Sequence, residues 1–327
     1  MQSEPIGFAD HILNTPLSPD GESNCASVNK AISPFESPCF FNSLTDSGSC
    51  TTERGWSAKH LMIGSNSATG GSNNNSDQQY IPGYLKHHSY GEYVFDWSLA
   101  NAFEHAGYNY YPKWVSQLPF TPIPMRNLPA DASLYQRLIA KLNSELDVLT
   151  YQFLYYPDLI IDLLEEQGAY RRRSVHFRWH NNDYRDFDDM LSHYSRKRAK
   201  EIRRERRKVT EQNITIRRFS STELTDDIVE RFFLFYRLTY LKRSGHHGYL
   251  TLSFFQQWLA NHADNLLIII ANDGQQDIAA ALFAYDCDTL YGRYWGSAYS
   301  NQLLHFELCY YQGMEFCLEN DLKYFNP

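Results

Sequence analysis

The second half of the chain shows a regular succession of apolar patterns. Short alternating or continuous apolar runs predict strands, and apolar side chains spaced three or four residues apart predict helices. Gly245 follows the first long helical pattern and predicts its end. The predicted elements are a strand at 214–219, helices at 224–242 and 252–262, strands at 265–271, 278–285 and 289–296, a helix at 304–320 and a strand at 322–325. This β-α-α-β-β-β-α-β order predicts a mixed α/β unit.

The first half shows a noisier version of the same order. The predicted elements are a helix at 36–47, strands at 59–63, 80–86 and 92–97, a helix at 98–106, a strand at 113–117, a helix at 131–146, and strands at 149–154 and 171–178 flanking a helix at 157–167. No residue-level repeat relates the two halves, so the order of elements alone supports a duplication. The fold class that this pattern predicts is α/β with mixed sheets, built as two units in tandem.

A basic amphipathic segment separates the two halves. Residues 184–210 place their apolar side chains on one helical stripe and many Lys and Arg on the remaining face, which predicts one long helix. Glu201 and Glu205 supply i,i+4 partners, and this favours a solvated face over a phosphate-binding one. Arg203 and Arg206 are the candidates for neutralising phosphates. Because no aromatic stacking set adjoins the segment, sequence-specific nucleic-acid binding is not predicted.

The composition sets the scale of the fold. With 327 residues, of which 43% are hydrophobic and 21% charged, the chain is long enough for two ordinary globular domains. The residues before 35 are rich in Ser, Pro, Asn and Asp and have no sustained period, which is typical of a mobile tail. The predicted division is a tail at 1–34, a first unit at 35–182 with a flexible loop at 64–79, a basic connecting helix at 183–212 and a second unit at 213–327.

Several classes of protein are not supported by the sequence. The longest apolar runs are far shorter than the ~20 residues of a membrane helix, and the first residues lack the basic-then-apolar pattern of a signal peptide. We therefore expect a soluble, cytoplasmic protein without a membrane span. The six cysteines form no CxxC pair and have no His at metal-ligand spacing, so neither a metal site nor a disulfide framework is predicted.

The densest group of polar and aromatic residues lies at 86–97. Glu92 and Asp96 stand among large aromatic side chains, and burial among them would raise a carboxylate pKa towards the range of a general base. Gly91 would permit the close approach of a ligand to the backbone. The alternative is an edge strand whose acids point into water. The candidate substrate-binding residues are Lys86, Ser89, Tyr90, Glu92, Asp96, Trp97 and, further along the chain, Lys113.

A second group follows the last of the three central strands. His305 and Glu307 begin a predicted helix, where backbone N–H groups and the helix dipole favour an anion or an oxyanion. Either residue could take the proton of an attacking amine, while Tyr291 and Arg293 would line an acyl channel or steady the oxyanion. The alternative is a packing or capping His305 and a Glu307 that is only a favourable first-turn charge.

Six motifs in one order connect these groups with a known family. They are His88-Ser89-Tyr90-Gly91-Glu92-Tyr93-Val94-Phe95-Asp96-Trp97, Tyr110-Tyr111-Pro112-Lys113, Pro119-Phe120-Thr121-Pro122, Ile202-Arg203-Arg204-Glu205-Arg206, Leu290-Tyr291-Gly292-Arg293-Tyr294-Trp295-Gly296 and His305-Phe306-Glu307-Leu308-Cys309-Tyr310-Tyr311. Over residues 35–327 the chain resembles the bacterial FemAB-like family of peptidoglycan biosynthesis/recognition, a branch of the acyl-CoA N-acyltransferase (GNAT) superfamily. The resemblance implies tandem GNAT-like units. It also implies that the second unit is truncated after residue 327, which would leave an unpaired sheet edge.

The same resemblance implies an acyl- or aminoacyltransferase that acts on an amine acceptor, for which a peptidoglycan precursor is the candidate. The donor would be acyl-CoA or aminoacyl-tRNA, and no cofactor would be bound permanently. No Gln/Arg-x-x-Gly-x-Gly/Ala loop lies between strand 289–296 and the following helix, which weakens an acetyl-CoA assignment. The alternative function is a non-catalytic module that recognises a cell-wall precursor. For transfer, we expect the two groups of candidate residues to line one groove between the units.

Overall fold

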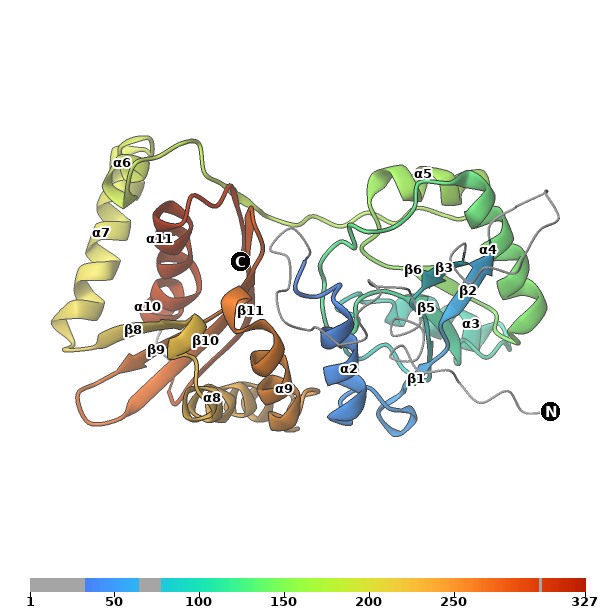
Figure 1. The fold of residues 1–327 in the computed structure, drawn as a ribbon, viewed down its shortest axis with the longest axis horizontal. Helices are drawn as coiled ribbons and strands as arrows, with labels where there is room; N and C mark the ends of the chain where they lie inside the picture. Colours follow the sequence, from blue (N-terminus) through green and yellow to red (C-terminus); the bar gives the residue numbers. More distant parts are fainter. Residues whose placement is uncertain (1–32, 65–77, 300–301) are drawn as a thin grey trace, which may run out of the picture. The chain divides into compact units, whose positions relative to one another are not determined.

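The chain folds into two compact units, drawn in Figure 1. The structure is a computed structural model that describes residues 33–64, 78–299 and 302–327. The first unit comprises Pro38–Ser174, and the second comprises residues 33–37 together with Val175–Pro327. Most of the predicted tail and of the loop at 64–79 lies outside the described residues.

The first unit contains a four-stranded mixed sheet in the order β1-β4-β5-β6. β4 pairs antiparallel with β1 and β5, whereas β5 and β6 are parallel and are connected through α4. The strands are β1 (Trp56–Ala58), β4 (Tyr84–Lys86), β5 (Lys113–Ser116) and β6 (Tyr151–Phe153), and β2 (Leu61–Gly64) and β3 (Gln78–Ile81) form a separate ribbon. The helices are α2 (Pro38–Asp46), α3 (Trp97–His105), α4 (Ala132–Glu145) and α5 (Asp158–Glu166).

Two strands predicted for this unit are wrong. Residues 92–97 form a loop that leads into α3, because Gly91 and Tyr93 both adopt positive φ angles that interrupt an extended strand. Residues 171–178 are not a strand either, since the side chains of 172–178 are exposed and offer no face to a sheet. The strand that follows, β7 (Trp179–His180), belongs to the second unit.

The second unit contains a six-stranded sheet in the order β7-β12-β11-β10-β9-β8. All neighbouring strands are antiparallel except β11 and β12. The strands are β8 (Thr215–Ser220), β9 (Leu266–Asn272), β10 (Asp277–Tyr285), β11 (Thr289–Ser297) and β12 (Tyr324–Asn326). Together with the helices below, they confirm the predicted β-α-α-β-β-β-α-β order.

The helices of this unit begin and end where side chains satisfy the backbone. α8 (Asp226–Ser244) is capped by Thr225, whose side chain accepts from the N–H of Ile228, and it ends at Gly245 in the left-handed conformation. α9 (Leu252–His262) is capped in the same way by Thr251. The helix predicted at 304–320 is composed of α10 (Gln302–Phe306), a π-helical turn (Glu307–Tyr311) and α11 (Gln312–Glu319).

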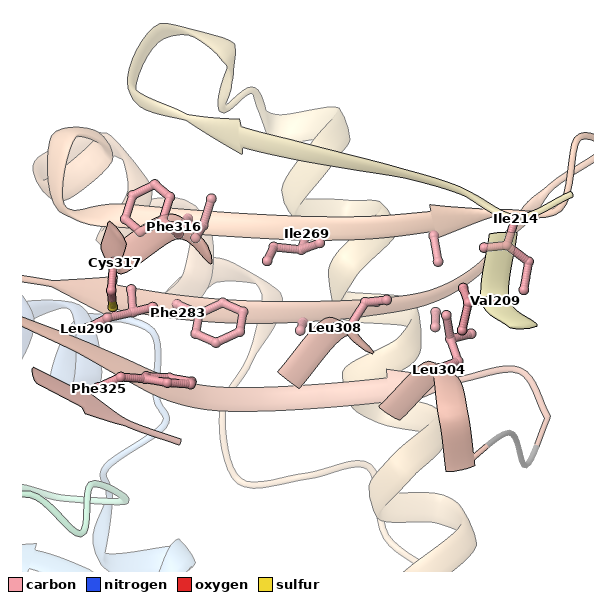
Figure 2. Close-up of a cluster of buried hydrophobic side chains, with 14 of the residues drawn as sticks. Val209, Ile214, Ile269, Phe283, Leu290, Leu304, Leu308, Phe316, Cys317 and Phe325 are labelled. Atoms are coloured by element: carbon pink, nitrogen blue, oxygen red, sulfur yellow. The ribbon is translucent and has the colours of Figure 1, made fainter. Parts of the chain in front are cut away.

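The core of the second unit lies between the sheet and this interrupted helix. Figure 2 shows Ile269 and Phe283 of the central strands beside Leu304 and Leu308 of the helix. Strands β9 and β10 are apolar on both faces and nearly every side chain in them is buried, which explains their continuous apolar sequence. Among the described residues, no helix is both long enough and apolar enough to cross a membrane.

The single long helix predicted at 184–210 is wrong. The segment forms two helices, α6 (Phe187–Ser192) and α7 (Arg196–Glu211), and Ser195 between them caps α7 by accepting from the N–H of Arg198. Both helices bury apolar side chains in one cluster: Met190, Leu191, Ala199, Ile202 and Tyr311. Since Tyr311 comes from the π-helical turn, α7 packs within the second unit, to which Val175–Pro327 belong.

The unpaired edge expected at the last strand is also wrong. β7 adds to the outer side of β12, with Trp179 opposite Phe325 and His180 opposite Tyr324. The guanidinium group of Arg178 donates to Asn326 and lies over the ring of Tyr324, 4.8 Å from its centre. A segment that precedes α6 in the sequence therefore covers the edge, and periodicity cannot reveal such a non-local pairing.

Candidate functional site

A buried cation organises the polar cluster of the first unit. Lys113 begins β5, and its Nζ lies 2.6 Å from Asp96 Oδ2 and 2.7 Å from Glu92 Oε2. It also donates to Ser89 Oγ at 2.8 Å and to Gln152 Oε1 at 3.0 Å, so four acceptors surround three N–H bonds. Lys113 and Glu92 are fully buried and Asp96 is almost so. The structure thus brings together residues that are up to 63 positions apart in the sequence.

The two carboxylates of this cluster have different surroundings. Asp96 Oδ2 also accepts from the hydroxyl of Tyr110 at 2.6 Å and from Gln152 Nε2 at 3.2 Å. Burial acts to raise the pKa of Asp96, but hydrogen bonds from Lys113, Tyr110 and Ser89 outweigh it and lower the pKa to about 2. Burial dominates at Glu92 and raises its pKa to about 7, even though Lys113 opposes the rise. Asp96 is therefore a fixed anion, and Glu92 can exchange a proton near neutral pH.

Each carboxylate keeps one oxygen without a partner. Glu92 Oε1 and Asp96 Oδ1 are buried, and no described residue donates a hydrogen bond to either. A buried carboxylate oxygen without a donor is unfavourable, because desolvation removes its water without compensation. Two such oxygens around one lysine are suited to receive the N–H groups of a ligand.

A second lysine lies close to the same cluster. The Nζ of Lys86 donates to the carbonyl oxygen of Tyr90 and lies 3.6 Å from the ring centre of Trp56. Burial lowers the pKa of Lys86 to about 7, partly offset by the charge of Glu92. Lys86 is fully buried, and its Nζ bonds to the backbone of the loop at Tyr90. Its side chain is therefore not an exposed contact for an anion.

The loop over the cluster exposes aromatic rings. Tyr90 is 53% exposed and contacts both His88 and Trp97 at ring-centre distances of 5.1 and 5.5 Å. Gly91 has a φ of 81°, and a Cβ there would lie 2.6 Å from the ring of Phe120. The close approach predicted for Gly91 is therefore made by the chain's own Phe120.

In the second unit, β11 carries an irregularity at a predicted site residue. Leu282 of β10 is opposite Tyr294, but the next residue, Phe283, is opposite Gly292, so Arg293 is an extra residue in β11. β11 pairs with its parallel neighbour β12 at Thr289, Leu290 and Tyr291, and the bulged Arg293 follows two residues after Tyr291.

The side chains around this bulge come from distant segments. Tyr291 is buried and donates its hydroxyl proton to Asp286 Oδ2 at 2.8 Å. Phe35 contacts the ring of Tyr291 edge to face, and the guanidinium carbon of Arg293 lies 5.8 Å from the centre of the Phe35 ring. The bulge is thus packed against residues 33–37, which the sequence analysis assigned to the tail and the first unit.

Glu307 and Arg206, both predicted as site residues, bond to each other. Arg206 Nε donates to both carboxylate oxygens of Glu307 at 3.2 Å, and Gln312 Nε2 donates to Oε1 at 2.8 Å. Arg206 also bonds to Glu315 and lies over the ring of Phe187. With both oxygens occupied, Glu307 is poorly placed to accept another proton, and it lies in the π-helical turn, not at a helix N-terminus.

His305 points to a different environment from Glu307. Its ring contacts Trp295 edge to face at 5.1 Å and Tyr310 at 5.8 Å. Burial, with a smaller contribution from Arg243, lowers the pKa of His305. Arg203 bonds to Asp188 of α6 at 3.0 Å. The ring contacts of His305 agree with the packing alternative, and the ion pair of Arg203 agrees with a solvated face of the basic helix.

The second unit also contains a pocket of about 470 Å³. Its lining includes Phe187, Leu191, Arg203, Arg207, Ile216 and Glu307, which come from α6, α7, β8 and the π-helical turn. The acidic and basic groups in the lining largely neutralise one another. Among the described residues, no group of His, Cys, Asp and Glu is arranged to hold a metal ion.

Sequence reasoning found the charged residues of the first-unit cluster but missed two partners. Tyr110 and Gln152 bond to Asp96 and to each other, with 2.6 Å between Gln152 Nε2 and the Tyr110 hydroxyl. The sequence signal for Tyr110 is its place in the motif Tyr110-Tyr111-Pro112-Lys113. Gln152 comes next to Lys113 only through the parallel pairing of β5 and β6.

Comparisons with known proteins connect this site to a family. A model of the FemAB-like family, described as peptidoglycan biosynthesis/recognition, matches residues 22–327. The chain belongs to the FemAB-like family. Because the match spans the polar cluster, the bulged strand and the basic helix, these features all lie in the FemAB-like region of the sequence. No curated protein matches the chain.

This FemAB-like chain is also similar to solved structures at low identity. A crystal structure of FemX is 11% identical, with 84% of this chain and 79% of that chain covered and a TM-score of 0.43. L-PGS from Bacillus licheniformis is 10% identical, with 90% and 76% covered and a TM-score of 0.47. The C-terminal domain of a putative lysylphosphatidylglycerol synthetase from Agrobacterium fabrum is 10% identical, with 88% and 73% covered and a TM-score of 0.45.

Proposed function

We propose that this FemAB-like protein is an aminoacyltransferase that forms an amide on the amine of a peptidoglycan precursor. The observation that carries the proposal is Glu92, a buried carboxylate with a pKa of about 7 and one oxygen that no described residue bonds. Amide formation requires an amine to lose a proton as it attacks a carbonyl, and a base with a pKa near the working pH is the most effective acceptor.

The reaction can be written with the groups of the first unit. The acceptor amine attacks the carbonyl carbon of an aminoacyl ester, a C–N bond forms, and the C–O bond to the donor breaks. Glu92 Oε1 takes the proton released by the amine and passes it to the departing oxygen, which leaves as a hydroxyl group. Lys113 holds Glu92 through Oε2 and Asp96 through Oδ2. Since the cluster is covered, binding of the acceptor requires movement of the loop that contains Tyr90.

In this proposal the second unit holds the acyl donor. Support comes from the bulge of β11, which carries Arg293, the residue expected to line an acyl channel or steady the oxyanion. The sequence lacks a Gly-rich loop for the pyrophosphate of acyl-CoA between β11 and α10. We therefore propose aminoacyl-tRNA as the donor, with acyl-CoA as the alternative. A shared groove between the units stays a prediction.

The test compares two candidate bases in one assay. A muramyl-peptide precursor with a free side-chain amine is incubated with labelled aminoacyl-tRNA or acyl-CoA, and its mass is followed. Glu92→Gln should reduce turnover by about 10²–10⁴-fold, whereas Glu307→Gln should retain it. Loss of turnover in Glu307→Gln alone would move the base to the second unit. No mass increase with any donor would contradict the transferase proposal.

A second function is favoured by the exposed rings of the covering loop. Tyr90, Tyr93, Phe95 and Trp97 are all at least 41% exposed, and contiguous exposed aromatics mark binding surfaces. The protein would then be a recognition module that retains a cell-wall precursor without modifying it. Such a module would bind an immobilised precursor, lose that binding in Tyr90→Ala/Trp97→Ala, and show no donor-dependent mass increase.

A further inference from the structure

The exposed face of α7 carries a row of cations. Arg196, Lys200, Arg204 and Lys208 are spaced four residues apart, so they form one ridge along the helix. At a rise of 1.5 Å per residue, adjacent members are about 6 Å apart along the axis and the row is about 18 Å long. All four side chains are exposed.

The acidic side chains of α7 bond to residues outside the ridge. Glu201 bonds to Arg198 at 2.8 Å, Glu211 bonds to Arg207 at 3.4 Å, and Glu205 accepts from the hydroxyl of Tyr311. Arg204 lies near Glu201 without bonding to it. In the described parts of the chain, no acid forms a salt bridge with a member of the ridge. Ion pairs within α7 thus involve Arg198 and Arg207, whereas the four exposed cations of the ridge form none with the described acids.

The ridge is unfavourable for the helix by itself. Like charges at i,i+4 positions destabilise a helix, and the ridge contains three such pairs. The first turn of α7 is basic and holds no acid, although the positive end of the helix dipole favours negative charge there. An external polyanion along the helix would offset both effects: it would screen the repulsion between the cations and supply negative charge near the first turn.

The helix is also fixed in place. Ala199, Ile202 and Val209 are buried, and Arg206 bonds to Glu307 and Glu315 on the opposite helix. A rigid helix presents its cations at fixed spacing, which suits the phosphates of a nucleic-acid strand. A membrane-surface helix would instead need its apolar face free to enter the lipid, and here that face is covered by protein.

We propose that the ridge Arg196–Lys200–Arg204–Lys208 binds the phosphate backbone of a double-helical RNA, which would be the RNA part of the aminoacyl donor. This inference rests on the proposed function for the identity of the RNA. The contact is independent of base sequence, because the ridge contains only cations that reach phosphates and no aromatic side chain that stacks on bases.

The experiment measures the binding of a labelled RNA hairpin by fluorescence anisotropy over a series of salt concentrations. Four phosphate contacts predict a slope of log K against log salt of about −3. The variant Arg196→Gln/Lys200→Gln/Arg204→Gln/Lys208→Gln should lose about 100-fold in affinity at 0.15 M salt and most of the slope. Its circular dichroism spectrum and unfolding midpoint report that the fold is retained.

A matched control distinguishes the effect of removing the ridge from the effect of lowering the net positive charge elsewhere on the protein. Arg54→Gln/Lys59→Gln/Arg217→Gln/Lys323→Gln changes the net charge by the same amount at positions outside α7, and should leave both affinity and slope nearly unchanged. Equal losses in the two variants would overturn the proposal. So would binding of wild type to phosphatidylglycerol vesicles with a flat salt response to the hairpin, which would indicate a membrane partner.

Transfer assays distinguish this inference from the proposed function. A raised KM for aminoacyl-tRNA with unchanged kcat in the ridge variant would support both. An unchanged KM would overturn the proposed RNA binding by the ridge and would leave the transferase proposal intact. Salt-dependent, ridge-dependent hairpin binding without transfer from any donor would support the ridge as an RNA-binding surface and contradict the transferase.

Discussion

Glu92 and Asp96 share one cation, the Nζ of Lys113, and yet their pKa values move in opposite directions. Asp96 Oδ2 collects donors from Lys113, Tyr110 and Gln152, whereas Glu92 Oε2 receives only Lys113. The additional donors stabilise the charged form of Asp96 and outweigh its burial. Glu92 lacks them, so burial raises its pKa to about 7. One cluster therefore contains a permanent anion and a group that exchanges a proton.

The pH dependence of transfer should follow Glu92. A base must be deprotonated to act, so kcat/KM should rise with pH through about 7 and level off above it, with about ten-fold less activity one unit below the midpoint. The measurement is kcat/KM for transfer between pH 5.5 and 8.5. The residual activity of Glu92→Gln should lose this rise. A rise that persists in Glu92→Gln would assign the titration to another group, such as Lys86.

Removal of the shared cation should destabilise the first unit. Lys113→Met leaves two buried carboxylates without their partner, a change that typically lowers the free energy of unfolding by about 3–5 kcal/mol. Urea unfolding measures the loss. The triple variant Lys113→Met/Glu92→Gln/Asp96→Asn removes the uncompensated charges and should recover part of the stability.

The control for that variant is a half-buried lysine with one acidic partner. Lys141 of α4 lies 3.6 Å from Glu145 and donates to the carbonyl oxygen of Met62 at 3.0 Å, and a partly solvated pair of this kind contributes less than about 1 kcal/mol. Lys141→Met should therefore have little effect on unfolding. If Lys113→Met has equally little effect, the buried cluster does not hold the unit together.

The strand and helix order of the second unit could be predicted because each element has its own local signal. β9 and β10 are continuous apolar runs separated by the turn at 272–276, where Gly274 has a φ of 91°. α8 is bounded by Thr225 and Gly245, which cap it. Short elements such as β7 lack such signals, since two residues that pair with a distant strand leave no period in the sequence.

The charged members of the candidate site could be predicted, but their roles could not. Glu307 was a plausible base from its place in the sequence, and only its distances to Arg206 and Gln312 show that both oxygens are occupied. Phe35 was assigned to a different unit because its packing on Tyr291 joins segments about 250 residues apart. Tertiary contacts of this kind decide which polar groups are left to react.

A close contact between a helix and a strand gives another prediction. A Cβ at Gly296 of β11 would overlap the carbonyl oxygen of Phe235 in α8. Gly296→Ala forces the two elements apart and should destabilise the second unit by about 1–3 kcal/mol or more, measured by urea unfolding. Gly64→Ala is the control, because no atom of the described residues lies within 4 Å of a Cβ there. Equal stability of the two variants would contradict this packing.

Acid should weaken the second unit through His262. Its Nε2 lies 2.6 Å from Ser37 Oγ in a buried contact, and burial lowers the pKa of the imidazole from 6.5 to about 4. Between these values the unfolded chain binds a proton that the folded chain does not, so the free energy of unfolding falls as pH drops. From pH 7.5 to 5 the fall should be about 2 kcal/mol.

Urea unfolding of wild type and His262→Gln at both pH values measures this contribution. The variant should lose about 2 kcal/mol less than wild type on acidification, because Gln keeps a polar partner for Ser37 but does not titrate. His105→Gln, which changes an imidazole on the exposed end of α3, should behave as wild type. The same loss in His262→Gln as in wild type would show that acid acts through other groups.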